Sequence, residues 1–165
     1  MDLAVAAAAA VHVLVERRQT LASAESLTGG LIAATIVEIP GVSSVFRGGL
    51  VVYATDLKHT LAGVPKRLLE ERGAVDADVA RALATGARER CAAHWTVATT
   101  GVAGPDPQDG KPVGLVFVAV AGPDGATVRE LNFSGSRASI RTGSAIAVLE
   151  LLLDELRKAP AGMQP

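Results

Sequence analysis

Cysteine, aromatic residues and closely spaced histidines are all scarce in this 165-residue chain. The single cysteine, Cys91, excludes an internal disulfide and any zinc site built from four cysteines or from two cysteines and two histidines. The three histidines, at positions 12, 59 and 94, share no short metal-ligand spacing with one another or with carboxylates. We therefore expect no metal ion, and no motif indicates another cofactor.

The chain also has no large excess of charge of either sign. It has 16 Lys and Arg residues and 17 Asp and Glu residues, which gives a net charge of -1. Only 3% of the residues are aromatic. This balance lacks the basic surface and the stacking side chains of nucleic-acid-binding proteins, so we exclude nucleic acid as the main ligand. The apolar run of residues 3–15 is too short to span a bilayer and lacks signal-peptide features. We expect a cytoplasmic protein with no membrane partner.

What is present is the composition of a globular α/β protein, with 49% apolar residues and no linker or repeat. Apolar spacing, capping residues and turn residues predict helices over residues 2–18, 28–38, 55–62, 65–73, 77–93 and 139–158. Strands are predicted over 20–25, 49–54 (buried), 95–100, 113–121 and 127–133. This alternation, closed by one hairpin, indicates a single three-layer α/β/α domain over residues 1–165, with a mixed sheet of about five strands and a flexible tail at about 159–165.

In open sheets of this class, ligands bind beyond the carboxyl ends of the strands. One such place is the segment AESLTGG, residues 24–30. Ser26 there would have an exposed hydroxyl beside free backbone N–H groups, which suits a nucleophile with an oxyanion hole or an anion site. Gly29 and Gly30 would let a ligand approach the backbone. The simpler interpretation is that Ser26 only caps the next helix and that Glu25 pairs with a surface arginine.

A second segment joins Tyr53, at the end of a strand predicted to be buried, to Lys58, in the first turn of the next helix. The positive end of the helix dipole disfavours a cation there. If Lys58 is also partly desolvated, its pKa falls and the amine becomes a plausible general base. A solvated Lys58 beside a packed Tyr53 is the alternative.

Two further segments suit an anionic ligand. Thr100 and Gly101 open a loop rich in glycine and proline, whose N–H groups suit a phosphate or a sugar, although such residues also form ordinary turns. No Walker P-loop or dinucleotide-binding motif is present. Arg137 and Arg141 are four residues apart near the start of the last helix, where an anion would offset their unfavourable position; pairing with surface acids is the alternative.

Six motifs occur in one order along the chain: AESLTGG (24–30), PGVSSVFRGGLVVYATDLKHTLAGV (40–64), GAV (73–75), TGVAGP (100–105), KPVG (111–114) and FSGSR (133–137). In this order and spacing, from about residue 5 to residue 156, the chain resembles the CinA C-terminal domain family. Stand-alone members of that family are nicotinamide-nucleotide amidohydrolases. The longer CinA proteins carry an N-terminal nucleotide-processing domain in addition, and we expect only the C-terminal domain here.

The resemblance implies metal-free hydrolysis of the carboxamide of nicotinamide mononucleotide, giving nicotinic acid mononucleotide and ammonia. It places the nucleophile on Ser26, the catalytic lysine on Lys58 and a neighbouring tyrosine on Tyr53, and it leaves open which of the last two is the immediate base. The substrate-binding residues we expect are Thr28, Gly29, Gly30, Thr100, Gly101, Arg137 and Arg141. N–H groups near Thr28 and Gly29 would stabilise the oxyanion, and Arg137 would hold the 5′-phosphate.

Two features depart from the family pattern. Leu27 stands where a cysteine is usual, and the loop of residues 105–111 is slightly shorter and lacks a double glycine. Two other functions therefore stay open: a non-catalytic nucleotide-binding or protein-interaction module of the competence or damage-inducible type, and a hydrolase of another small amide. Because the terminal helices are apolar, we expect a homo-oligomer, namely a dimer.

Overall fold

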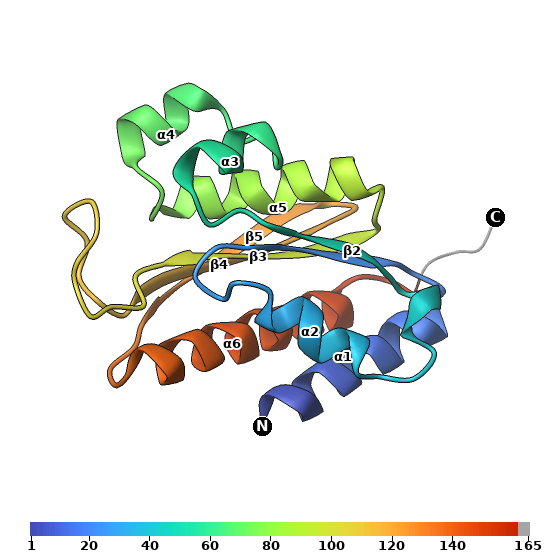
Figure 1. Cartoon of the computed structure of the whole chain (residues 1–165). Coiled ribbons are helices and arrows are strands. Elements are labelled where there is room, and N and C mark those ends of the chain that lie inside the picture. The colour runs from blue at the N-terminus through green and yellow to red at the C-terminus, as the bar shows by residue number, and fades with distance from the viewer. Residues whose placement is uncertain (162–165) are drawn as a thin grey trace.

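A five-stranded mixed sheet lies at the centre of the structure (Figure 1), a computed structural model that describes residues 1–161. The strands are β1 (Leu21–Glu25), β2 (Phe46–Val51), β3 (Trp95–Gly101), β4 (Leu115–Gly122) and β5 (Gly125–Asn132). Their order across the sheet is β2-β1-β3-β4-β5. The first three are parallel, whereas β4 and β5 are antiparallel to their neighbours and form the predicted hairpin. The predicted fold class is therefore confirmed.

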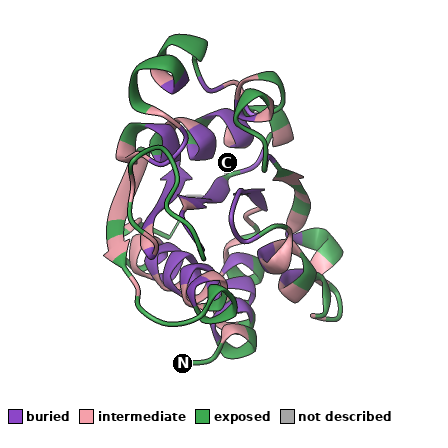
Figure 2. Cartoon of the chain, turned by 60° about the vertical axis from the view of Figure 1, so that its left-hand side comes forward, coloured by how far each residue is buried: buried purple, intermediate pink, exposed green. Residues whose placement is uncertain are grey.

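Helices cover both faces of this sheet (Figure 1). One layer contains α1 (Leu3–Arg17), α2 (Leu31–Val37) and α6 (Arg137–Lys158), and the other contains α3 (Thr55–Thr60), α4 (Lys66–Arg72) and α5 (Ala77–Cys91). Each layer encloses an apolar core against the sheet, and buried residues gather between the helices while exposed residues lie on the outside (Figure 2). Within residues 1–161, no helix has both the length and the apolar character needed to cross a membrane.

Side-chain caps fix the N-terminal ends of the three longest helices. Asp2 accepts a hydrogen bond from the Val5 N–H at the start of α1, and Asp76 accepts from two N–H groups at the start of α5. Ser136 caps α6 by accepting from the Ser139 N–H. Because of that cap, α6 begins at Arg137 rather than at residue 139 as predicted.

Three other sequence predictions need correction or lie outside the described part of the chain. Strand β2 spans Phe46–Val51 and not 49–54, and alternate residues are exposed because it is an edge strand rather than a buried one. The helix predicted from residue 28 begins only at Leu31, since Gly29 and Gly30 have φ angles of 58° and 97°, which are not helical. Residues 162–165 of the predicted tail lie outside the described residues.

Candidate active site

The three parallel strands end at one edge of the sheet, as the order β2-β1-β3 requires. Glu25, the last residue of β1, pairs with Val51 on one side and with Thr99 on the other. The segments that follow, beginning at Ser26 and Val52, therefore leave the sheet side by side with the end of β3. Residues from separate parts of the sequence meet here, which is the usual place for a ligand in open α/β sheets.

Ser26 and Lys58 are in direct contact at this edge. The Lys58 Nζ donates a hydrogen bond to the Ser26 Oγ at 3.0 Å, and it also donates to the main-chain oxygens of Val52 at 2.8 Å and Tyr53 at 3.2 Å. Helix α3 makes this possible because it begins four residues after the end of β2 and so brings the Lys58 side chain back to the main chain at Val52 and Tyr53. The two carbonyl groups fix the amine in position, and its third hydrogen-bonding direction points toward the Ser26 hydroxyl.

Burial sets the protonation of this lysine. The Lys58 side chain is 1% exposed, and within residues 1–161 it makes no ion pair with a carboxylate. Desolvation of the ammonium lowers the pKa of Lys58 from 10.5 to about 8. At pH 7 about one such lysine in ten is neutral, compared with fewer than about one in a thousand at the ordinary value. A neutral amine bonded to both carbonyls directs its lone pair at the serine hydroxyl.

A tight turn follows the serine. The Gly29 N–H donates to the Ser26 main-chain oxygen at 3.0 Å, and Leu27 and Thr28 both have negative φ, which together define a type I turn. Gly29 itself needs the left-handed region, with φ at 58°. Among the described residues, the N–H groups of Leu27 and Thr28 have no protein hydrogen-bond partner. These two donors remain available beside the serine.

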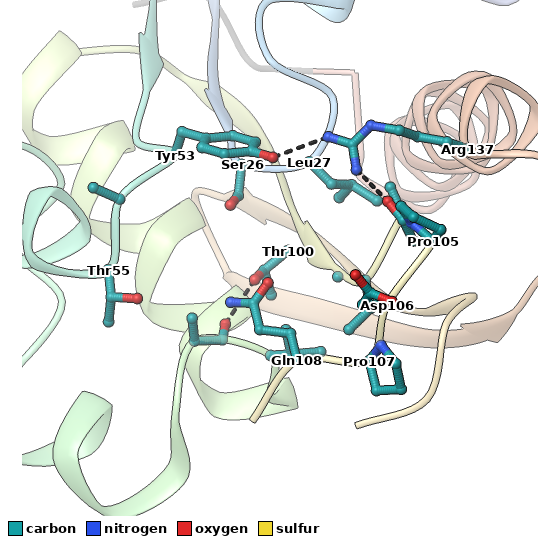
Figure 3. Close-up of a pocket in the computed structure, with 17 residues that line it drawn as sticks. Ser26, Leu27, Tyr53, Thr55, Thr100, Pro105, Asp106, Pro107, Gln108 and Arg137 are labelled. Carbon is teal, nitrogen blue, oxygen red and sulfur yellow. Dashed lines mark hydrogen bonds between the residues drawn. The ribbon is translucent and has the colours of Figure 1, made fainter. Parts of the chain in front are cut away.

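A cavity of about 440 Å³ opens in front of Ser26 (Figure 3). Its wall consists of residues 26–27, 53–55, 74–75, 100–108 and 137. The predicted residues Thr100 and Gly101 belong to this wall, and the Thr100 hydroxyl donates to the main-chain oxygen of Ala74 at 2.6 Å. The volume falls in the range of small-molecule sites.

Tyr53 and Arg137 meet at the rim of the cavity (Figure 3). An Arg137 Nη donates to the Tyr53 hydroxyl at 3.0 Å, and the other Nη donates to the main-chain oxygen of Gly104. The Tyr53 side chain is 59% exposed, so it is not packed in the core. The guanidinium has five N–H donors, and these two bonds use only part of them. An anionic group of a ligand at the rim could therefore bind the Arg137 guanidinium.

The structure does not bring four of the predicted substrate-binding residues to the cavity wall: Thr28, Gly29, Gly30 and Arg141. The Thr28 hydroxyl is buried against the Thr99 hydroxyl at 2.9 Å. Arg141 instead donates to the main-chain oxygens of Leu27 at 2.8 Å and Thr28 at 2.9 Å. The glycines shape the turn, and Gly30 is the N-cap residue of α2.

Three simpler interpretations from the sequence are wrong. Ser26 does not cap α2, because that position belongs to Gly30. Glu25 does not pair with a surface arginine; it is fully buried, and its two carboxylate oxygens accept from the N–H groups of Ile32 at 2.9 Å and Ala33 at 3.1 Å. Lys58 is likewise not solvated.

Sequence reasoning missed several polar groups of the site. Asp106 and Gln108 line the cavity from the glycine- and proline-rich loop, and Thr55 lines it from the start of α3. The main-chain oxygens that hold Lys58 carry no sequence signature at all, whereas the two loop residues stand out as polar side chains within the loop. Within residues 1–161, no group of three His, Cys, Asp or Glu side chains is arranged to hold a metal ion.

Comparison with known proteins shows the family of this chain. The model of the CinA C-terminal domain matches residues 4–156. A CinA-like protein from Frankia casuarinae is 47% identical over 147 residues, which are 89% of this chain but 34% of that protein. A CinA-like protein from Geobacter sulfurreducens is 49% identical over 145 residues, covering 87% of this chain and 35% of its own length. The chain thus spans about a third of the length of these relatives.

Solved structures of similar size agree in fold. The competence/damage inducible protein CihA from Agrobacterium tumefaciens superposes with a TM-score of 0.89 at 35% identity, over 95% of this chain and 96% of its own. A CinA superfamily protein from Escherichia coli gives a TM-score of 0.89 at 28% identity, over 93% of this chain and 90% of its own. The match extends over nearly the whole of both chains.

Proposed function

The chain belongs to the CinA C-terminal domain family, and from this premise we propose that it is an amidohydrolase that converts nicotinamide mononucleotide into nicotinic acid mononucleotide and ammonia. The observation that carries the proposal is the 3.0 Å contact between the Ser26 Oγ and a buried Lys58 amine. A nucleophile in contact with a base of lowered pKa is the arrangement that acyl transfer needs.

The first half of the reaction acylates the serine. The neutral Lys58 amine takes the hydroxyl proton as the Ser26 Oγ attacks the carboxamide carbon. The carbonyl oxygen becomes an oxyanion, which the free N–H groups of the turn after Ser26 would stabilise. Lys58 then gives its proton to the leaving nitrogen, and the carbon–nitrogen bond breaks to release ammonia.

The second half hydrolyses the acyl-enzyme. A water molecule gives a proton to Lys58 and attacks the ester carbon, and the bond to the Ser26 Oγ then breaks with return of that proton. The products are free serine and a carboxylic acid, which loses its proton to the solvent and leaves as the carboxylate. Since the nucleophile and the base are both protein side chains, we propose a reaction that needs no metal. Tyr53 would act at the rim, where its hydroxyl is bonded to Arg137 rather than to Lys58.

The Arg137 guanidinium in the cavity wall suits a substrate with an anionic end. A pyridinium near Lys58 further disfavours the ammonium form and lowers the lysine pKa. The 5′-phosphate would bind the Arg137 guanidinium, which lies in the cavity wall. Thr100, Gly101 and the loop that carries Asp106 and Gln108 would contact the ribose.

The competing proposal is a non-catalytic module that binds a nucleotide or another protein. The name of the Agrobacterium relative, a competence/damage inducible protein, is the observation in its favour. A binding module gains nothing from burying a lysine against a serine, because desolvation of the ammonium opposes folding. For this reason we favour the enzyme.

The test is to incubate the purified protein with nicotinamide mononucleotide in the presence of a chelator, and to measure ammonia and nicotinic acid mononucleotide together. We expect the two products in equal amounts. Free nicotinamide serves as the second substrate, and we expect much slower release from it because it lacks the phosphate. Equal rates on both amides would indicate a hydrolase of another small amide. No release from folded protein would favour the binding module.

A further inference from the structure

The Arg141 side chain forms hydrogen bonds with the main chain of the turn after Ser26. It lies one helical turn after Arg137 on α6, and its Nε and one Nη donate to the main-chain oxygens of Leu27 at 2.8 Å and Thr28 at 2.9 Å. Within residues 1–161, it makes no ion pair with a carboxylate. The half-buried guanidinium thus donates hydrogen bonds to two carbonyl groups of the turn that directly follows the candidate nucleophile.

These two bonds fix the direction of a peptide group. The Leu27–Thr28 peptide is trans, so its carbonyl and its N–H point in opposite directions. With the Leu27 carbonyl held by Arg141, the Thr28 N–H points away from the arginine. In a type I turn the N–H groups of the central residues lie on the side of the first residue's side chain, which here is Ser26.

The neighbouring amide groups cannot replace this donor. The Gly29 N–H is bonded to the Ser26 main-chain oxygen at 3.0 Å, and the Ser26 N–H is bonded to the Thr99 main-chain oxygen at 3.1 Å. The N–H groups of Leu27 and Thr28 are therefore the donors left beside the serine hydroxyl in the described part of the chain. Of the two, the Thr28 N–H belongs to the peptide whose carbonyl Arg141 holds.

We propose that Arg141 is a positioning residue, which holds the Leu27–Thr28 peptide so that the Thr28 N–H donates to the oxyanion formed at Ser26. This inference rests on the proposed function, and it replaces the direct substrate contact that the sequence suggested for Arg141. A charge-assisted bond to the carbonyl also polarises the peptide and strengthens its N–H as a donor. Arg141 thereby acts on the reaction through the backbone, without touching the substrate.

The test compares Arg141→Met and Arg141→Lys with Arg129→Met. Arg129 also fastens α6, through Asp154 at 3.2 Å, but it is remote from the serine turn, so it controls for loss of an anchoring arginine. For Arg141→Met we expect kcat to fall about 10- to 100-fold while KM changes less than about threefold, because an oxyanion donor acts in the transition state. Arg141→Lys, which keeps a charged donor, should recover part of kcat. The pH midpoint of the rate should stay in place, since Lys58 is untouched.

Two outcomes would overturn the inference. One is a kcat of Arg141→Met equal to that of the wild-type protein. The other is a rise in KM at constant kcat, which would mean that Arg141 binds the substrate directly.

A second measurement makes the inference independent of the substrate. A small fluorophosphonate forms a bond from the Ser26 Oγ to phosphorus, fluoride leaves, and the serine proton goes to Lys58; the rate is followed by mass spectrometry. We expect Arg141→Met to be labelled at least about tenfold more slowly than Arg129→Met, since the phosphoryl oxygen needs the same N–H donor. If the protein releases no ammonia but shows this difference, the proposed substrate fails and the role of Arg141 stands. Equal labelling rates would refute that role whatever the substrate.

Discussion

Burial of Lys58 is the residue-scale feature that decides the chemistry of the site. The amine reaches the Ser26 Oγ and two main-chain oxygens, and the side chain is almost fully removed from water. Desolvation lowers the pKa of Lys58 to about 8, which makes the neutral form accessible near neutral pH. The sequence placed Lys58 at the start of a helix, but it could not show that carbonyl groups of its own chain would hold the amine.

The pH dependence of catalysis follows from this pKa. If neutral Lys58 is the base, kcat/KM rises with pH, about tenfold per unit well below pH 8, and levels off above it. Steady-state rates between pH 5.5 and 9.5 measure the midpoint. Lys58→Met should lose the activity at every pH. A rate that is flat across this range in the wild-type protein would contradict the role of the lysine.

Stability should also depend on pH through Lys58. The folded-state pKa lies below the unfolded value of 10.5, so the unfolded chain binds more protons between pH 8 and 10.5, and the free energy of unfolding rises with pH in that window. The rise attributable to Lys58 is at most about 3 kcal/mol. Urea unfolding at pH 7, 9 and 10 would measure it, with Lys58→Met as the control that lacks this rise. If the free energy of unfolding changed with pH equally in the wild type and in Lys58→Met, the effect would be refuted.

At the scale of elements, the turn between β1 and α2 depends on a buried carboxylate. Glu25 ends β1, and its two oxygens accept from the Ile32 and Ala33 N–H groups in the first turn of α2. The helix N-terminus is thereby tied to the last residue of the strand that leads into Ser26. Because α2 has only seven residues, its own hydrogen bonds cannot hold it in isolation.

Glu25→Gln should lower the free energy of unfolding by about 1–3 kcal/mol, since one charged acceptor is replaced by an amide that brings buried N–H donors. Glu16→Gln is the matched control, because Glu16 is an exposed residue of α1 and its change should have an effect within about 0.5 kcal/mol. Urea unfolding at pH 7 compares the two. Equal stability of both variants would show that the carboxylate is not needed.

Helix α5 packs against the backbone that leads out of α3. A Cβ at Gly86 would lie 1.7 Å from the main-chain oxygen of Ala62, so no side chain fits between them. Gly86→Ala should therefore lower the free energy of unfolding by more than about 2 kcal/mol, despite the better helix propensity of alanine. Thr85→Ala, at an exposed neighbouring position, should change it by less than about 0.5 kcal/mol. A Gly86→Ala protein as stable as the wild type would contradict this packing.

Glycine shows why element boundaries were harder to predict than elements. The apolar pattern of residues 28–38 predicts a helix, but Gly29 and Gly30 adopt positive φ angles and delay its start to Leu31. The bounds predicted for strand β2 were wrong because the prediction took it for a buried strand. It pairs with β1 alone, and alternate residues are exposed. Such boundaries depend on tertiary contacts that local propensity does not contain.

At the scale of the whole molecule, the site is assembled from segments far apart in the sequence. Ser26, Tyr53, Thr100 and Arg137 all line one cavity, and Lys58, which is not part of its wall, contacts the Ser26 hydroxyl. The alternation of strands and helices predicted the fold class, and the ends of parallel strands predicted where these residues meet. The sequence did not separate Arg137, which lines the cavity, from Arg141, which holds the serine turn, because one helical turn apart both fit an anion equally well.

The most direct test of the central claim is the rate of ammonia release from nicotinamide mononucleotide by Ser26→Ala. The control is Ser134→Ala, at an exposed position outside the cavity wall, and both variants should match the wild type in thermal unfolding. We expect Ser26→Ala to lose at least about 10⁴-fold in kcat, as removal of a nucleophile does, and Ser134→Ala to retain the wild-type rate. Ammonia release by Ser26→Ala at the wild-type rate would contradict the assignment of Ser26 as nucleophile, and with it the mechanism.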